Sequence, residues 1–263
     1  MKRVWVSAVA ALALAACGQK PTTQVDLVVL AGQSNAVGYR LTRADLPTAS
    51  AAPFRDVLIW QDGDFAPLTP GTNTGTPRQP GAWGPEVGFA QAWRAAHPGR
   101  RLYLVKHARG STTLAEAPGP DWAPGSGELF AETTAKVEAA SASLANQGFR
   151  PRVIGVLWVQ GEADATGPAW TAAYGRNLAA LIKSMRLAWS APGAVVVLAK
   201  IPDWGGHAKA VRAAQAEVDR GDALTVSVDA QGLPMQADGL HLSAEGQLRL
   251  GERLAAALLQ ATE

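Results

Sequence analysis

The chain has 263 residues, of which 48% are hydrophobic, and its formal net charge is +2. This length and apolar fraction allow one sizeable core, so we expect one folded domain. The weak net charge and the lack of a long run of like charges disfavour nucleic-acid binding and a charged binding tail.

The N-terminus has the features of a secretory signal peptide. Its start is basic, and residues 4–16 are almost wholly apolar but too short to span a membrane. The string "LAAC" resembles the lipobox of bacterial lipoproteins, in which the cysteine is lipidated and becomes the first mature residue. This cysteine, Cys17, is the only one in the chain, so no disulfide forms within it, and the alternative is a buried free thiol. We predict a signal peptide at 1–16 and a lipidated linker at 17–24.

Beyond the linker, short apolar segments alternate with longer segments of helical spacing. The short segments are rich in β-branched residues and mostly lack alternation, which is typical of strands covered on both faces. We predict strands at 25–31, 56–60, 101–108, 152–160, 194–201 and, more weakly, 224–230. We predict helices at 84–97, 128–148, 170–189, 208–220 and 243–260. This order favours an α/β domain at 25–263, a three-layer α/β/α sandwich with a mainly parallel sheet of five or six strands.

Two segments lack any periodicity and are expected to be loops. Residues 61–83 are rich in Gly, Pro and Thr, and residues 114–127 are rich in Pro and Gly. Because structureless segments of this length inside a compact domain are often functional, we expect them to lie near a binding site.

A serine ends the first predicted strand, in "VDLVVLAGQSNAVGY". Gly32 allows a tight bend, and Ser34 follows it just beyond the carboxyl end of the strand. Ligands of parallel sheets bind beyond these ends, and backbone N–H groups at a helix start favour an anion. The hydroxyl is therefore a candidate nucleophile, and the alternative is an ordinary turn. A serine nucleophile needs a base and a third group that orients the base.

His241 is the histidine best placed to serve as that base. It follows Asp238 by three residues, so the carboxylate can accept a hydrogen bond from Nδ1 and leave Nε2 free for Ser34. The simpler alternative is a polar turn before the last helix. Two further fragments fit the same chemistry, because Gly110 in "ARGST" offers a backbone N–H and Gln160 in "WVQGEAD" offers a side-chain amide. With the serine N–H, they would form a three-point oxyanion hole.

Five fragments carry a resemblance to a known family: "LAGQSN", "GPE", "RGST", "WVQGEAD" and "DGLHLS". Their order and approximate spacing resemble the SGNH hydrolase superfamily, in its sialate O-acetylesterase and acetylxylan esterase-like branch, carbohydrate esterase family six. The resemblance implies that Ser34 is the nucleophile, His241 the general base and acid, and Asp238 its orienting partner. It also implies that Gly110 and Gln160 donate to the oxyanion.

Arg109, in "RGST", is a departure from this branch, in which Gly-Gly-Thr or Gly-Gly-Ser is common at that fragment. It offers a cation for the carboxylate of a sialic or uronic acid. The alternatives are a solvated side chain or an ion pair with Glu162 or Asp164. We expect Asn35 and Glu162 to support the site structurally rather than to take part in catalysis.

Three tryptophans lie in predicted loops near the strand ends: Trp83, Trp122 and Trp204. Indole rings there can stack on sugar faces, and the alternative is that they anchor the loops to the domain. The histidines are scattered and no phosphate-binding loop is present, so we expect no metal and no other cofactor.

These features predict a serine esterase that removes O-acetyl groups from carbohydrates, such as sialic acid or xylan, through an acyl-enzyme. The alternatives are a lipase, thioesterase or arylesterase of the same fold, and a non-catalytic envelope protein that binds glycans. The expected partners are an acetylated carbohydrate and, through the lipid on Cys17, a membrane. The residue after Cys17 is Gly18 rather than the aspartate associated with inner-membrane retention in some Gram-negative bacteria. In an organism with an outer membrane, the resemblance therefore favours that membrane within the cell envelope.

Overall fold

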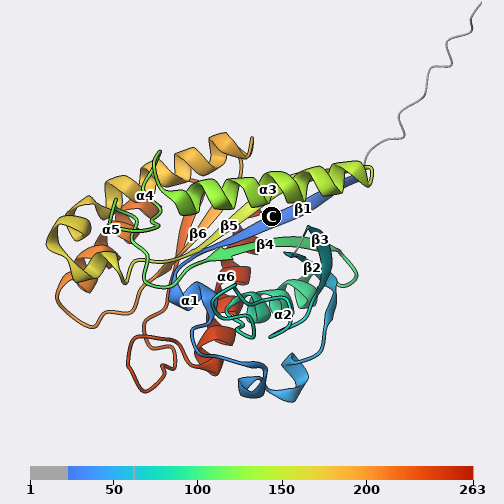
Figure 1. Cartoon of the computed structure of the whole chain (residues 1–263), viewed down its shortest axis with the longest axis horizontal. Helices are drawn as coiled ribbons and strands as arrows, with labels where there is room; N and C mark the ends of the chain where they lie inside the picture. The colour runs from blue at the N-terminus through green and yellow to red at the C-terminus, as the bar shows by residue number, and fades with distance from the viewer. Residues whose placement is uncertain (1–22, 62, 263) are drawn as a thin grey trace, which may run out of the picture.

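The computed structural model of the chain describes residues 23–61 and 63–262, which form a sheet between two groups of helices (Figure 1). The predicted signal peptide and Cys17 lie outside the described residues. Strand β1 begins at Thr23, so the predicted linker is two residues too long.

The sheet has seven strands in the order β3-β2-β4-β1-β5-β6-β7. Neighbouring strands are parallel, except that β3 runs antiparallel to β2 at one edge. The strands are β1 Thr23–Gly32, β2 Phe54–Gln61, β3 Asp64–Leu68, β4 Leu102–Ala108, β5 Phe149–Val159, β6 Val195–Lys200 and β7 Thr225–Asp229. The prediction of five or six strands is wrong because β3 was assigned to a loop. Its short sequence contains a proline, and pairing with β2 makes it a strand, as is typical of an edge.

The helices cover both faces of the sheet, as predicted. Helices α2 (Glu86–Ala96) and α6 (Ala244–Thr262) pack on one face, and α3 (Glu128–Asn146), α4 (Pro168–Ala188) and α5 (His207–Gly221) on the other (Figure 1). The short helix α1 (Ser34–Val37) follows β1 directly, and the described chain also has 3₁₀ turns at Arg43–Asp45, Thr48–Ser50 and Asp164–Thr166. Within the described residues, no helix is both long and apolar enough to cross a membrane.

Successive residues of the central strand β1 enter separate cores. Val28 and Leu30 pack with residues of α2 and α6, whereas Leu27 and Val29 pack with residues of α3 and α4. All four side chains are fully buried. Because both faces are covered, the strand reads as a continuous apolar run rather than as an alternating pattern.

The carboxyl ends of the three central strands lie side by side. Gly32 at the end of β1 pairs with Ala108 of β4 on one side and with Val159 of β5 on the other. The loops that follow these strands therefore meet at one edge of the sheet, and the predicted site residues of all three loops come together there.

Candidate active site

Ser34 lies at the start of α1, immediately beyond the end of β1. Gly32 has a φ of +148°, and a Cβ there would lie 2.0 Å from the Val159 carbonyl oxygen. Only glycine fits this bend, which turns the chain and places the serine at the sheet edge. The expected role of Gly32 is confirmed.

Ser34, His241 and Asp238 form a continuous line of contacts. The distance from His241 Nε2 to Ser34 Oγ is 3.0 Å, and that from His241 Nδ1 to Asp238 Oδ2 is 2.7 Å. Asp238 Oδ1 also accepts the backbone N–H groups of Leu240 and His241, each at 3.0 Å. Although burial acts to raise the pKa of Asp238, these hydrogen bonds outweigh it and lower the pKa to about 2. The carboxylate is therefore ionised and can orient the imidazole at neutral pH.

Two backbone N–H groups beside the serine hydroxyl donate no hydrogen bond within the described chain: those of Ser34 and Gly110. The loop after β4 passes directly over the serine, since a Cβ at Gly110 would lie 3.6 Å from the Ser34 Cβ. The next residue, Ser111, has a φ of 59°, a left-handed conformation that non-glycine residues rarely adopt. Such strain is typical of loops at functional sites.

Gln160 is fully buried, and the prediction that it donates to an oxyanion is wrong. Its amide nitrogen donates to the Thr112 carbonyl at 3.0 Å and to Asp164 Oδ2 at 2.6 Å, which uses both hydrogens. Asp164 also accepts the N–H groups of Leu114 and Ala115. Burial raises the pKa of Asp164 to about 6 against the effect of these hydrogen bonds. Gln160 and Asp164 therefore fix the loop after β4, which carries Gly110 and Ser111.

Asn35 and Glu162, the expected supporting residues, are in direct contact. Asn35 Nδ2 donates to Glu162 Oε1 at 2.6 Å and to the Leu240 carbonyl at 3.3 Å, while its Oδ1 accepts the Leu242 N–H at 2.9 Å. The Glu162 side chain is almost fully buried, and its Oε2 has no hydrogen-bond partner among the described residues. Burial raises the pKa of Glu162, and the hydrogen bond from Asn35 opposes this only in part.

Two cavities meet at Ser34, Ser111 and His241. The first, of about 370 Å³, we call the cationic cavity, and its other lining residues include Tyr39, Arg78, Gln79, His107, Arg109 and Glu132. The second, of about 640 Å³, we call the aromatic cavity, and its other lining residues include Ala117, Pro118, Pro120, Trp170 and Trp204. A larger hollow of about 920 Å³ lies between α4 and α5. Ser34, Asp238 and His241 do not line it.

Arg109 lines the cationic cavity, and so does Arg78. Neither guanidinium has an ion-pair partner among the described residues, so the alternative pairing of Arg109 with Glu162 or Asp164 is not seen. Arg78 was missed because it lies in the predicted loop 61–83, where no local pattern singles it out. The cavity therefore holds two cations available to a ligand.

His107 and Glu132 line the same cavity and are in contact. The Nε2 atom of His107 is 3.1 Å from Glu132 Oε2. Burial lowers the pKa of His107 to about 3, with further lowering by Lys136 and Arg109. The imidazole is neutral at neutral pH, so this contact is not an ion pair.

The prediction that three tryptophans stack on sugars is wrong for two of them. Trp83 and Trp122 are fully buried, and their Nε1 atoms donate to the Thr42 carbonyl and to Thr112 Oγ1 respectively. They anchor loops, which was the alternative. Trp204, in contrast, is 44% exposed and lines the aromatic cavity.

Two further aromatic residues line the site and were not predicted from the sequence. Trp170 lines the aromatic cavity, and it was overlooked because it opens a predicted helix, where an aromatic residue is usually part of the core. The Tyr39 ring lies 4.2 Å from the His241 ring, between centroids, and its proximity to Ser34 in the sequence was the available signal. No group of His, Cys, Asp and Glu in the described chain could hold a metal ion.

A mainly parallel α/β sheet that presents a Ser-His-Asp line at the carboxyl ends of its strands is the arrangement of a serine hydrolase. The sequence profile described as "Carbohydrate esterase, sialic acid-specific acetylesterase" matches residues 24–260. The chain therefore belongs to this family of carbohydrate esterases.

Individual relatives agree with this assignment. The probable carbohydrate esterase At4g34215 of Arabidopsis thaliana is 29% identical over 259 residues, which covers 92% of this chain and 93% of that protein. Its X-ray structure has a TM-score of 0.74, at 26% identity over 90% of this chain and 98% of that one. NanS has the same fold, with a TM-score of 0.70 at 16% identity over 92% of this chain and 98% of that one.

Proposed function

We propose that this esterase removes O-acetyl groups from acidic carbohydrates through an acyl-enzyme formed on Ser34. The observation that carries the proposal is the line of contacts from Asp238 through His241 to the serine hydroxyl. The complete line also argues against the alternative of a non-catalytic glycan-binding protein.

The first half of the reaction forms the acyl-enzyme. His241 Nε2 removes the Ser34 proton as Oγ attacks the acetyl carbonyl carbon, and Asp238 stabilises the imidazolium. The negative charge develops on the carbonyl oxygen, which accepts hydrogen bonds from the N–H groups of Ser34 and Gly110. The C–O bond to the sugar then breaks, and His241 gives its proton to the leaving sugar oxygen.

The second half releases acetate. Water takes the place of the sugar, His241 removes a proton from it, and the hydroxide oxygen attacks the acetyl carbonyl. The same two N–H groups hold the oxyanion again. The bond to Ser34 Oγ breaks, the serine recovers its proton from His241, and the enzyme returns to its starting state without a cofactor.

The proposed substrate class rests on the cationic cavity. Arg78 and Arg109 line it beside Ser34 and His241, and both lack partners in the described chain. A guanidinium matches the geometry and charge of a carboxylate, so a sialic or uronic acid ester is favoured over neutral xylan.

The test of this function is acetate release from a panel of acetylated sialic acids, uronic acids and xylan. We expect the wild type to release acetate fastest from the acidic sugars. Ser34→Ala should lower kcat by at least about 10⁴-fold, as removal of a triad member does elsewhere. If the Ser34→Ala variant kept near-wild-type acetate release, the serine mechanism would be rejected.

We propose in addition that the mature protein is a lipoprotein of the cell envelope, anchored through Cys17 and facing the periplasm from the outer membrane. The support is the signal-like sequence before the cysteine and the resemblance of "LAAC" to a lipobox. Metabolic labelling with a fatty acid should mark the wild type but not Cys17→Ser. Labelling of both, or of neither, would remove this proposal.

A further inference from the structure

The two cavities that meet at Ser34 differ in chemistry. The cationic cavity is lined by Arg78, Arg109, His107 and Glu132. The aromatic cavity has no Lys or Arg in its lining, and its one carboxyl group, Glu162, is almost fully buried. One side of the serine is therefore suited to an anion, and the other is suited to a neutral group with a flat apolar face.

An acetyl group is too small to account for both spaces. The cavities have volumes of about 370 Å³ and 640 Å³, and both include Ser34 and His241 in their lining. Beyond the ester oxygen, an acetyl group adds only a carbonyl and a methyl. The alcohol part of the substrate must therefore extend to both sides of the serine if both cavities are used.

Trp204 gives the aromatic cavity an exposed indole face. It is 44% exposed, one of three large hydrophobic side chains exposed among the described residues, and the only one of them that lines this cavity. Trp170 and two prolines complete the lining. Sugars bind such surfaces through the apolar face of the ring, while their hydroxyl groups stay in water.

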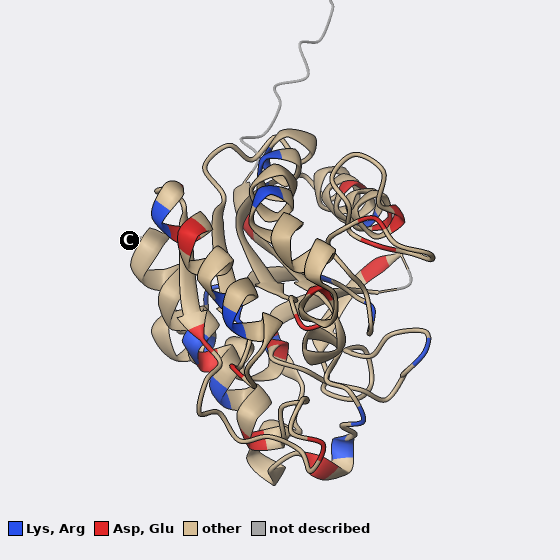
Figure 2. Ribbon diagram, turned by 90° about the vertical axis from the view of Figure 1, so that its left-hand side faces the viewer, with Lys and Arg blue, Asp and Glu red and all other residues tan. Residues whose placement is uncertain are grey.

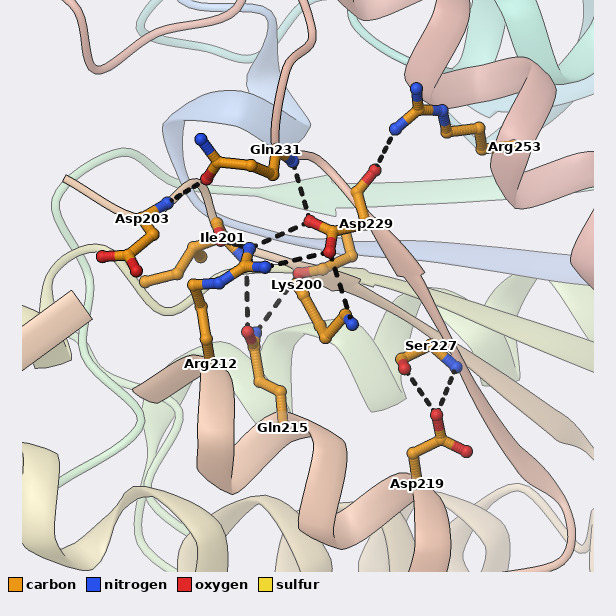
Figure 3. A network of polar contacts seen from close by, with 11 residues as sticks. Lys200, Ile201, Asp203, Arg212, Gln215, Asp219, Ser227, Asp229, Gln231 and Arg253 are labelled. Atoms are coloured by element: carbon orange, nitrogen blue, oxygen red, sulfur yellow. Dashed lines mark hydrogen bonds and ion pairs between the residues drawn. The ribbon is translucent and has the colours of Figure 1, made fainter. Parts of the chain in front are cut away.

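The loop that carries Trp204 is anchored on both sides of the indole. The Asp203 N–H donates to Gln231 Oε1, and Asp203 Oδ1 accepts the Gly205 N–H at 2.8 Å. Gln231 is held in turn, because its N–H donates to Asp229 Oδ1, which Arg212 also holds (Figure 3). The backbone at Trp204 is thus fixed while its side chain is exposed, as expected for a preformed binding surface.

We infer that the aromatic cavity binds a neutral sugar attached to the acetylated acidic sugar, so that the preferred substrate is a linked glycan rather than a free monosaccharide. The inference rests on the proposed function. The acidic sugar lies in the cationic cavity, its acetyl group is presented to Ser34, and the neighbouring sugar stacks on Trp204.

The test compares the same O-acetylated sialic acid in two forms, free and linked to a neutral disaccharide. For the wild type, kcat/KM should be about tenfold higher for the linked form. Trp204→Ala should abolish most of this ratio. Leu187→Ala is the matched control, because Leu187 is 78% exposed but lies in the hollow between α4 and α5, and the ratio should be unchanged.

The possible outcomes distinguish failure of the neutral-sugar site in the aromatic cavity from failure of the proposed esterase function. A wild type that favours the free monosaccharide, or a Trp204→Ala variant that keeps the wild-type ratio, would overturn the neutral-sugar site and leave the esterase proposal intact. A wild type that releases acetate from neither form would overturn the proposed substrate class, and the neutral-sugar site with it.

A separate observation concerns Asn35, the residue after the serine. Its side chain bonds to the backbone on both sides of His241, since Oδ1 accepts from Leu242 and Nδ2 donates to Leu240. The Leu242 N–H can only donate, so the amide oxygen must face it, and the nitrogen is thereby turned toward Glu162. Glu162 Oε1 then accepts the shortest of these hydrogen bonds, at 2.6 Å.

We propose that Asn35 is a positioning residue that holds His241 against the nucleophile, and that Glu162 holds Asn35 in place. Asn35 lies on α1, the helix that presents Ser34, and its side chain bonds to the backbone on both sides of His241. We call the hydrogen bonds of the Asn35 amide to Leu240, Leu242 and Glu162 the Asn35 brace. They use both N–H groups and the oxygen of the amide.

The test uses a pair of substitutions at Glu162. In Glu162→Gln, the side-chain carbonyl can still accept from Asn35, so kcat should stay within about threefold of the wild type, with the same pH profile. Glu162→Ala removes the acceptor and should lower kcat about tenfold while KM changes less than twofold. Asn35→Ala should lower kcat further, by about 100-fold.

Thermal unfolding measured in parallel separates positioning from simple loss of fold. If Glu162→Gln lost activity as completely as Glu162→Ala, the carboxyl group itself would be required and the brace would be rejected. The brace would also be rejected if Asn35→Ala and Glu162→Ala, both folded at the assay temperature, kept the wild-type kcat.

Discussion

Ser34 and His241 are 207 residues apart in the sequence, yet their reacting atoms lie 3.0 Å apart. Asp238 could be predicted because it is three residues from the histidine, within one turn of the chain. Gln160 could not be assigned correctly, because a short motif does not say which way an amide faces. Asp164, four residues later, accepts from it and determines that direction.

Replacing Gln160 tests the corrected assignment. We expect Gln160→Ala to lower kcat less than tenfold, whereas loss of an oxyanion donor commonly costs about 10²–10³ in kcat. The free energy of unfolding should fall by about 1–3 kcal/mol, because the buried Thr112 carbonyl and Asp164 lose a donor. Steady-state kinetics and denaturant unfolding measure both. A kcat loss of 100-fold with unchanged stability would restore the original assignment.

Replacing Arg109 tests the recognition of an acidic sugar. We expect Arg109→Ala to raise KM about tenfold for acetylated sialic or uronic acids, since a charged hydrogen bond worth about 1.4 kcal/mol corresponds to that factor. The KM for neutral acetylated sugars should not change. Arg249→Ala, at an exposed ion pair on α6, is the matched control. Equal increases in KM for acidic and neutral esters would remove the carboxylate role.

At the scale of elements, the buried parallel strands could be predicted from composition, because coverage by helices on both faces requires continuous apolar runs. The edge strand β3 could not, since its partly exposed sequence gains its structure from pairing with β2. The loop after β4 could be recognised as a loop, but its shape could not. That shape depends on hydrogen bonds to Gln160 and Asp164, which come from the segment after β5.

Asp164 makes a specific contribution to the pH dependence of stability. Burial raises its pKa from 3.8 to about 6, so the folded chain binds this proton more tightly than the unfolded chain. Its contribution to stability is complete below about pH 4 and is lost as the pH rises from about 4 through 6 to about 7. The difference in unfolding free energy between wild type and Asp164→Asn should therefore fall by about 3 kcal/mol over this range.

Urea unfolding at a series of pH values measures this difference. Above about pH 7 the difference should stay constant, because the carboxyl group is then largely ionised in both the folded and the unfolded chain. A difference that is constant from pH 4 to pH 7, or that rises with pH, would show that the folded carboxyl group is not held in its neutral form.

At the scale of the whole molecule, charge is dispersed rather than gathered. Figure 2 shows Lys and Arg interspersed with Asp and Glu over the ribbon, and the formal net charge is only +2. The layers could be predicted from the alternation of strands and helices. The order β3-β2-β4-β1-β5-β6-β7 could not, because strand pairing is set by contacts between distant segments.

Because charge is dispersed over the molecule, salt should affect the reaction only by screening the arginines of the cationic cavity. Without a strong long-range field, we expect kcat/KM for an acidic sugar ester to fall about two- to fourfold between 0.05 and 0.5 M NaCl, as the arginines are screened. For a neutral ester it should stay constant, and in Arg109→Ala the salt dependence for the acidic ester should weaken. A fall of several orders of magnitude would indicate long-range steering instead.

The sharpest test of the serine mechanism is to identify which residue carries the acetyl group during turnover. The wild type should be mixed with an acetyl ester, quenched in acid within milliseconds and digested for mass spectrometry. We predict one acetyl group on the peptide that contains Ser34, and none on that peptide in Ser34→Ala. Rapid acetate release by the wild type with no acetyl group on Ser34, under conditions in which deacylation limits the rate, would contradict this prediction.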